Sequence, residues 1–265
     1  MTVQRILTVI GLCVLVTWGC VGCRTAEERA ERKLNRKYGD LPLEERKAAE
    51  ILDRVKIEIG DGQHIRTIAE SGSMTSYDQE GTETNSPFQQ HVAFPDKSRI
   101  RIDTPGGTWI TIINGNFGWE VQGEVIQELQ PEEVARKRIE LKRSVLGLFK
   151  YRHEFKVTWL REEMVSERKY DVLKAESPEL QFEIWFDSQF HTPYRLTYEE
   201  PVGDQMVTVH RTIQNLLRIE GFLYPIQYRV TKTDGTPLRE VRIDDVRTNI
   251  AMVDGYFDRP HKLYP

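Results

Sequence analysis

The sequence predicts a mainly β protein with a few helices, in which one highly curved antiparallel sheet wraps a single core. Between Thr67 and Thr248, segments rich in β-branched and aromatic residues recur about every ten residues, separated by Gly, Asn, Asp and Pro. Several segments alternate apolar with polar residues, as Phe182, Ile184 and Phe186 do, so each such strand has one apolar face. Apolar faces on consecutive antiparallel strands predict one curved sheet. No Pro/Ser-rich linker or internal repeat divides the segments, so we expect one large domain.

The composition excludes several classes of protein. The 265 residues include 37 Lys and Arg against 41 Asp and Glu, a net charge of −4, so the global basic field typical of nucleic-acid-binding proteins is absent. With 39% hydrophobic and 29% charged residues and a mean hydropathy of −0.52, the chain is neither a polytopic membrane protein nor a disordered one. Its three cysteines, Cys13, Cys20 and Cys23, precede residue 24, which excludes disulfide scaffolds and cysteine zinc sites elsewhere.

The N-terminal residues are typical of an export signal. The apolar run over residues 6–18 suits a secretory signal and is shorter than the roughly 20 residues that span a bilayer. The Val-Gly-Cys sequence ending at Cys23 resembles the bacterial lipobox, in which signal peptidase cuts before a cysteine whose sulfur is lipidated, although Cys20 stands where the lipobox usually has Leu. We therefore predict a lipoprotein signal peptide over residues 1–22 and lipid attachment at Cys23. An uncleaved anchor and a Cys20–Cys23 redox pair are the alternative interpretations.

A charged segment and a helix follow. Residues 23–47 carry both charge signs densely and few large apolar side chains, so we interpret them as the lipid anchor and a solvated tether. An amphipathic helix is predicted over residues 43–59, because Pro42 and two following glutamates are typical of a helix start and apolar residues recur from Ala48 at helical spacing. Gly60 is expected to end this helix.

Turn sequences delimit the strands on both sides of a second helix. Asn114-Gly115 between two apolar runs is the strongest hairpin signal in the chain. Pro131, followed by two glutamates, opens a helix predicted over residues 131–150. A long loop is predicted over residues 78–86. The expected strands are 65–77, 89–94, 98–103, 108–113, 117–121, 125–129, 155–160, 167–175, 180–186, 193–199, 206–217, 223–233 and 238–248.

Local sequences and the order of the elements resemble a known superfamily. The best local matches are FPDKSRIRID at residues 94–103 and IINGNFGWE at residues 112–120. Residues 221–225 and 241–246 are similar to a closing hairpin, and residues 254–257 to the usual C-terminal end. Together with the order of helix, strands, mid-chain helix and strands, these sequences resemble the LolA/LolB/LppX superfamily of lipoprotein carriers and envelope lipid-binding proteins.

The resemblance implies both a fold and a function. Residues 48–265 would form an unclosed β-barrel whose apolar concave face is covered by the N-terminal helix and by a lid helix at 131–150. The cavity would reversibly bind acyl chains of lipids or lipoproteins without catalysis. Separately, the lipobox-like sequence implies that acyl chains on Cys23 hold the protein in membrane lipid at the cell envelope, and Arg24 in place of the Asp used for inner-membrane retention favours the periplasmic face of the outer membrane. The residues expected to line the cavity are Ile100, Ile102, Trp109, Trp119, Val145, Phe149, Phe182, Ile184, Phe186 and Tyr228.

Two other classes of function remain as alternatives. The first is an interaction lipoprotein with the same fold and a filled core, because large aromatic residues on strands are usually core residues. The second is an enzyme, for which there is little support: the six histidines are scattered, and no HExxH, nucleophile-elbow, P-loop or dinucleotide-binding sequence is present. Adjacent acidic pairs such as Glu162-Glu163 would point to opposite faces of a strand. We expect no enzyme activity, cofactor, metal or nucleic-acid partner.

Overall fold

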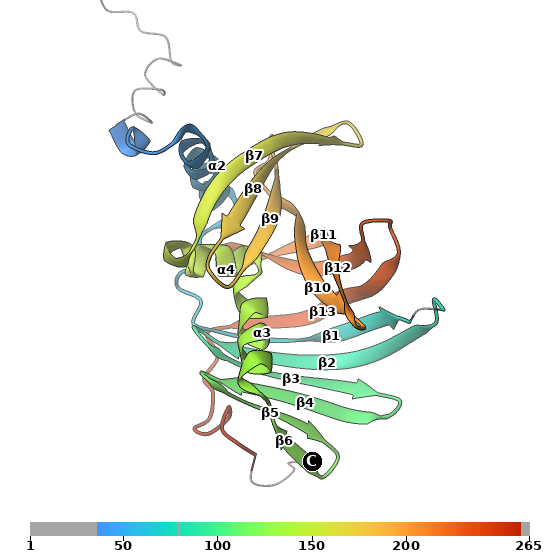
Figure 1. Cartoon of the computed structure of the whole chain (residues 1–265). Coiled ribbons are helices and arrows are strands. Elements are labelled where there is room, and N and C mark those ends of the chain that lie inside the picture. The colour runs from blue at the N-terminus through green and yellow to red at the C-terminus, as the bar shows by residue number, and fades with distance from the viewer. Residues whose placement is uncertain (1–35, 79, 261–265) are drawn as a thin grey trace, which may run out of the picture. The chain divides into compact units, whose positions relative to one another are not determined.

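The structure, a computed structural model, describes residues 36–78 and 80–260 (Figure 1). The chain divides into two units, Met1–Gly39 and Asp40–Pro265. Every strand described belongs to the second unit. The predicted signal peptide, Cys23 and most of the predicted tether lie outside the described residues.

One antiparallel sheet of 13 strands forms the body of the second unit. Its order is β6-β5-β4-β3-β2-β1-β13-β12-β11-β10-β9-β8-β7, so two meanders, β1 to β6 and β7 to β13, join where β1 pairs with β13. The strands at the two ends of this order, β6 and β7, do not pair with each other, and the sheet is therefore not closed into a barrel. The strands are β1 (Thr67–Tyr77), β2 (Glu83–Ala93), β3 (Lys97–Thr104), β4 (Gly107–Asn114), β5 (Phe117–Gln122), β6 (Val125–Glu128), β7 (Lys156–Val165), β8 (Arg168–Glu176), β9 (Gln181–Asp187), β10 (Pro193–Val202), β11 (Gln205–Ile219), β12 (Phe222–Lys232) and β13 (Pro237–Thr248).

The predicted fold class is confirmed, and each expected strand segment forms a strand. One expected loop was wrong: residues 78–86 do not form a long loop. The Asp78 carboxylate accepts hydrogen bonds from the backbone N–H groups of Glu80 and Thr82, at 2.9 and 2.8 Å, which makes a tight turn. Strand β2 therefore starts at Glu83 and pairs with the whole length of β1.

The predicted single helix over 131–150 was also wrong. It is two helices, α3 (Pro131–Lys142) and α4 (Val145–Lys150). Arg143 leaves the helical conformation (φ −83°, ψ 60°), and the next residue, Ser144, is extended and caps α4 by accepting a hydrogen bond from the Gly147 N–H at 2.8 Å. The pattern of apolar residues does not show this break. Ser144 does not show it either, because serine is also tolerated inside helices.

Helix α2 (Leu43–Ile59) has the bounds that the sequence predicts, and it packs on β7. Its buried face consists of Ala48, Ile51, Leu52, Val55 and Ile59. At its solvent-facing border the Lys47 ammonium lies 3.3 Å from the centre of the Trp159 ring, and Glu45 pairs with Lys156 at 3.2 Å. Gly60 ends the helix with a φ of 82°, where a Cβ atom would lie 2.6 Å from the Gly221 carbonyl oxygen.

The core is divided among several clusters. The main cluster joins α2 and α4 to the inner side of the second meander. A smaller cluster of Ile113, Leu129 and Val134 lies where α3 packs on β4 and β5. On the opposite side of β4 and β5, Ile112 and Trp119 pack against Phe257 of the C-terminal segment. The outer strands of the first meander are therefore covered on both faces.

The junction between β1 and β13 provides a test of the fold. The register shifts between Ser71 and Gly72, and a Cβ atom on Gly72 would lie 2.0 Å from the Arg242 carbonyl oxygen. We expect Gly72→Ala to lower the free energy of unfolding by about 2–3 kcal/mol, because the junction backbone must separate. Gly106→Ala, whose Cβ would meet no atom closer than 3.8 Å, should change it by less than about 0.5 kcal/mol. Chemical denaturation measures both; equal stability of the two variants would contradict the described register.

Candidate functional site

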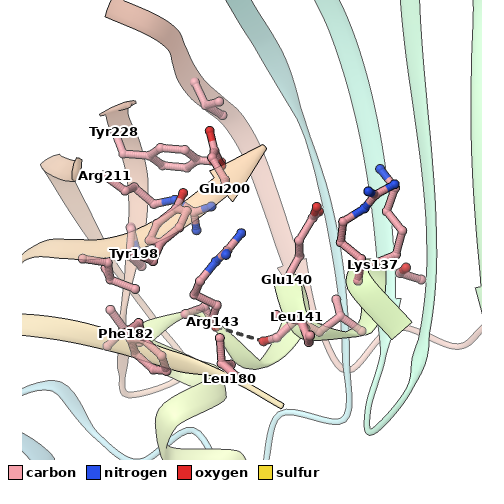
Figure 2. A pocket seen from close by; sticks show the side chains of 18 of the residues that line it. Lys137, Glu140, Leu141, Arg143, Leu180, Phe182, Tyr198, Glu200, Arg211 and Tyr228 are labelled. Carbon is pink, nitrogen blue, oxygen red and sulfur yellow. Dashed lines mark hydrogen bonds between the residues drawn. The ribbon is translucent and has the colours of Figure 1, made fainter. Parts of the chain in front are cut away.

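The concave side of the sheet contains a hollow of about 1290 Å³. Strands of both meanders form its walls, and α3, α4 and the break between them close one side (Figure 2). One wall is mainly apolar, although Gln90, Thr111 and Lys137 also line it, and it comes from β1 to β4 and the two helices. Its apolar residues are Ile68, Val92, Phe94, Ile100, Ile102, Ile113, Ile139, Leu141, Val145 and Leu146.

The alternation of β3 explains how the apolar wall is built. Ile100 and Ile102 point into the hollow, and the two arginines between and beside them point to the other face. On that other face Arg101 pairs with Asp103 at 3.1 Å, and Arg99 donates to the Tyr256 carbonyl oxygen at 3.4 Å. The sequence segment that carried the family resemblance therefore contributes apolar side chains to one face and ion pairs to the other.

The structure brings five of the predicted cavity residues to the hollow and places five elsewhere. Those that line it are Ile100, Ile102, Val145, Phe182 and Tyr228. Trp109 is cross-strand partner to Ile102, so it shares the concave face, but it is 40% exposed and lies outside the lining. Trp119 is on the opposite face, within the cluster around Phe257. The remaining three, Phe149, Ile184 and Phe186, are buried in the main core together with residues of α2.

The second wall of the hollow carries polar side chains among apolar ones such as Leu196, Ile213 and Val241, and of the expected cavity residues it contains only Tyr228. It comes from β1 and from β10 to β13, together with the residue at the helix break. Its members are Glu70, Arg143, Tyr198, Glu200, Arg211, Tyr224, Tyr228 and Arg239. Figure 2 shows Tyr198, Arg211 and Tyr228 on one side of the hollow and Arg143 and Glu140 reaching from the helical side.

A signal for this wall was present in the sequence. Arg211 lies on the same face of its strand as Val209 and Ile213, two residues that the strand pattern assigns to the apolar face. Arg239 has the same relation to Val241 on β13. A charged side chain at an inward position of a strand is a departure that points to a site, and weighing the apolar residues alone missed it.

One ion pair and one hydrogen bond satisfy some of the polar groups in this wall. Arg239 pairs with Glu200 at 2.6 Å, and the Glu200 side chain is only 10% exposed. The Tyr224 hydroxyl donates to the Glu70 carboxylate at 2.9 Å. Burial raises the pKa of Glu70 to about 7, despite the opposing effects of this hydrogen bond and of the Arg211 cation. Glu70 therefore holds its proton for part of the time at neutral pH.

A second group of polar contacts centres on Tyr198. The guanidinium carbon of Arg143 lies 3.7 Å from the centre of the Tyr198 ring, and that of Arg211 lies 5.4 Å from it. Arg143 also donates to the Glu199 carbonyl oxygen at 3.3 Å. Burial lowers the pKa of Arg143, and the neighbouring Arg211 cation adds to this effect. Two cations thus share one aromatic ring inside the hollow.

The described residues offer no arrangement that would hold a metal ion. Among the described residues, no group of three His, Cys, Asp or Glu side chains is placed to hold a metal ion. The described histidines stay apart, with His210 bonded to Thr197 at 3.0 Å and His91 to Tyr256 at 2.9 Å. No described helix is long and apolar enough to cross a membrane. What the hollow offers chemically is an apolar surface facing a wall of hydrogen-bond donors and charges.

Comparison with solved structures identifies the fold. A LolA superfamily protein from Nitrosomonas europaea superposes with a TM-score of 0.55 at 14% identity, covering 79% of this chain and 96% of that one. The chain has the fold of LolA superfamily proteins. A DUF1329 family protein from Desulfovibrio piger (TM-score 0.54, 13% identity, 80% and 97% coverage) and an outer membrane lipoprotein-sorting protein domain from Vibrio parahaemolyticus (0.53, 12%, 81% and 97%) are similarly close. The resemblance seen in the sequence is therefore confirmed for the LolA-like fold.

The same sequence matches no protein-family model and no curated protein. This chain therefore has a LolA-like fold with little sequence in common with those solved structures.

The raised pKa of Glu70 predicts a pH-dependent stability. An acid whose pKa is about 7 when folded and about 4.5 when unfolded binds more protons in the folded state between these values, so stability falls as pH rises through this range. Glu70→Gln removes this loss, and we expect it to raise the free energy of unfolding by about 1–2 kcal/mol at pH 8 with no change at pH 4.5. Urea denaturation at both pH values measures it. The exposed Glu128→Gln is the control; an equal gain from both variants would contradict the burial of Glu70.

Proposed function

We propose that this protein is a non-catalytic lipoprotein of the cell envelope whose hollow reversibly binds acyl chains of lipids or lipoproteins. The observation that carries the proposal is the hollow itself, with its apolar wall from β1 to β4 and the helices. Small-molecule sites typically measure about 300–1,000 Å³, so a volume of about 1290 Å³ has room for a long chain or more than one.

The energetics favour chain binding. Each methylene moved from water into the hollow contributes about 0.8 kcal/mol before the costs of ordering the chain. Protein interiors are packed to the density of organic crystals, so isoleucine and leucine side chains that line a hollow gain dispersion contacts when an acyl chain packs against them. The hollow favours this function over the interaction lipoprotein, which requires a filled core.

Helix α3 would act as the moving lid, with α4 fixed beside it. Ile139 and Leu141 of α3, with Val145 and Leu146 of α4, present apolar side chains to the hollow from one side. The break at Arg143 separates the two helices, so α3 can move without unpacking α4, whose buried residues belong to the main core. In this proposal α3 swings outward when chains enter. The LolA-like fold and the lipoprotein-sorting title of one similar structure support a carrier role.

The Cys23 prediction extends the proposal to the location of the protein. Residues 1–22 would be removed on export, and acyl chains on Cys23 would hold the second unit at the outer membrane, on its periplasmic face. Several acyl chains on one cysteine give stable anchoring, because each buried methylene adds about 0.8 kcal/mol.

Filling the hollow tests the binding site. Ile100→Trp places a larger side chain into the apolar wall, and we expect it to weaken binding of the fluorescent fatty acid cis-parinaric acid at least about tenfold. Val125→Trp, at an exposed position of β6, should bind like the unmodified chain. Fluorescence titration uses the chain from Arg24 onward, which retains every core residue described. Absence of binding to the unmodified chain, and of any lipid extracted from it, would contradict the proposal.

The anchor has its own test. Cells that express the full chain and are fed a radioactive fatty acid should label the protein, and Cys23→Ala should abolish the label, because the thiol is the predicted attachment site. Cell fractionation should find the unmodified protein in the membrane fraction and Cys23→Ala in the soluble fraction. Equal label on both forms would rule out Cys23 as the attachment site.

A further inference from the structure

The polar wall of the hollow contains two guanidinium groups that lack anionic partners. Arg143 is 8% exposed, and no carboxylate of the described residues lies within salt-bridge distance of Arg143 or Arg211. The Nε atoms of both arginines and the hydroxyl of Tyr198 are buried with no hydrogen-bond partner among the described residues. Buried donors are nearly always satisfied in native proteins, so three unsatisfied groups around one ring require an explanation.

The carboxylates of the hollow do not supply the missing partner. Glu200 is engaged by Arg239 at 2.6 Å, and Glu70 accepts the Tyr224 hydroxyl. Glu140 lies nearby on α3, but its side chain is exposed and makes no ion pair with either arginine among the described contacts. The hollow therefore keeps two guanidinium groups without a direct ion pair, although the charge of Glu140 attracts both.

Such a pair of cations is costly without a ligand. Each buried donor left without a partner costs about 1–3 kcal/mol, and two like charges beside one ring repel each other. A carboxylate or phosphate oxygen accepts hydrogen bonds from two guanidiniums and neutralises their charge at once. Arginine suits this role better than lysine, because its planar group presents several donors in a fixed fork.

We propose that the hollow binds amphiphiles with an anionic head group, carboxylate or phosphate, which Arg143 and Arg211 hold beside Tyr198 while the chain lies along the apolar wall. The inference rests on the proposed function, since it names the class of lipid that the same cavity takes. A neutral acyl glyceride would leave both guanidiniums unsatisfied and is the disfavoured cargo.

The helix break fits this assignment. Because Arg143 leaves the helical conformation and Ser144 starts a new helix, the Arg143 side chain turns toward β10 and its Tyr198, away from the helix surface. The head group would therefore contact the point at which α3 joins α4. Binding of the anion and position of the lid would be coupled through Arg143, which makes Arg143 a binding residue and a lid residue together.

The test compares three ligands that share one chain. Oleate, oleoyl lysophosphatidate and neutral oleyl alcohol each displace the neutral fluorescent probe N-phenyl-1-naphthylamine from the chain that starts at Arg24. We expect the better of the two anions to displace the probe at a concentration at least about tenfold lower than the alcohol. Arg143→Gln and Arg211→Gln should each remove most of this preference and leave displacement by the alcohol unchanged.

Matched variants separate the site from a general charge effect. Arg101→Gln removes one cation from the opposite face of the sheet, where Arg101 pairs with Asp103, and should keep the full preference. Arg211→Lys keeps the charge without the fork and should keep part of it. Thermal unfolding reports whether each variant is folded, and if Arg143→Gln is not, Arg211→Gln decides.

The outcomes are distinct. A preference for oleate assigns a free carboxylate, and a preference for lysophosphatidate assigns a phosphate head group; both support the inference. Equal displacement by the anions and the alcohol from the unmodified chain would overturn it while leaving acyl-chain binding intact. Equal loss in Arg101→Gln and Arg211→Gln would also overturn it. Failure of the unmodified chain to bind the probe or any lipid would overturn both this inference and the proposed function.

Discussion

An unclosed sheet with an apolar concave face must cover that face, and the helices of this chain cover it incompletely. Helices α2 and α4 complete the main core with the second meander, and α3 packs on β4 and β5. Between these packed regions the two walls stay apart and leave about 1290 Å³. The junction of β1 with β13 makes this possible, because it joins two meanders into one sheet that is wider than its helices. The hollow, its polar wall and the proposed role of α3 as a lid all follow from this mismatch between sheet and helices.

The hollow has two different sides, and in the proposed function these would give it chemical selectivity. An apolar wall alone would accept any acyl chain, since burial of methylenes is non-directional. The opposite wall would add direction: Arg239 and Glu200 neutralise each other, whereas Arg143 and Arg211 make no ion pair among the described residues and are the groups proposed to hold a ligand. The pKa of about 7 at Glu70 places a further charge in the same wall under the control of pH. Burying polar groups costs folding free energy, and a binding site that uses them would account for their presence.

Much of the fold could be predicted from the sequence, because local rules agree with it. Asn114-Gly115 requires a hairpin, and the spacing of apolar residues after Pro42 gives α2 its observed bounds. The candidate site was less accessible. The alternation of apolar and polar residues predicts that Trp119 is buried, but it does not tell which face of the sheet Trp119 lies on. The C-terminal segment around Phe257 covers the convex face, and nothing in the sequence indicated this cover. The place of Arg143 in the hollow could not be predicted, because the helix break that directs its side chain depends on a single serine cap.

Photochemical crosslinking with a diazirine fatty acid tests the central claim most directly, because it reports where a chain lies. After irradiation of the chain that starts at Arg24, peptide mapping should place the label on β3 and on α3 or α4, the elements that form the apolar wall. Excess unlabelled oleate should compete the label away. Label spread over the convex face near Phe257, or label that oleate does not displace, would contradict the account of the hollow as a binding site.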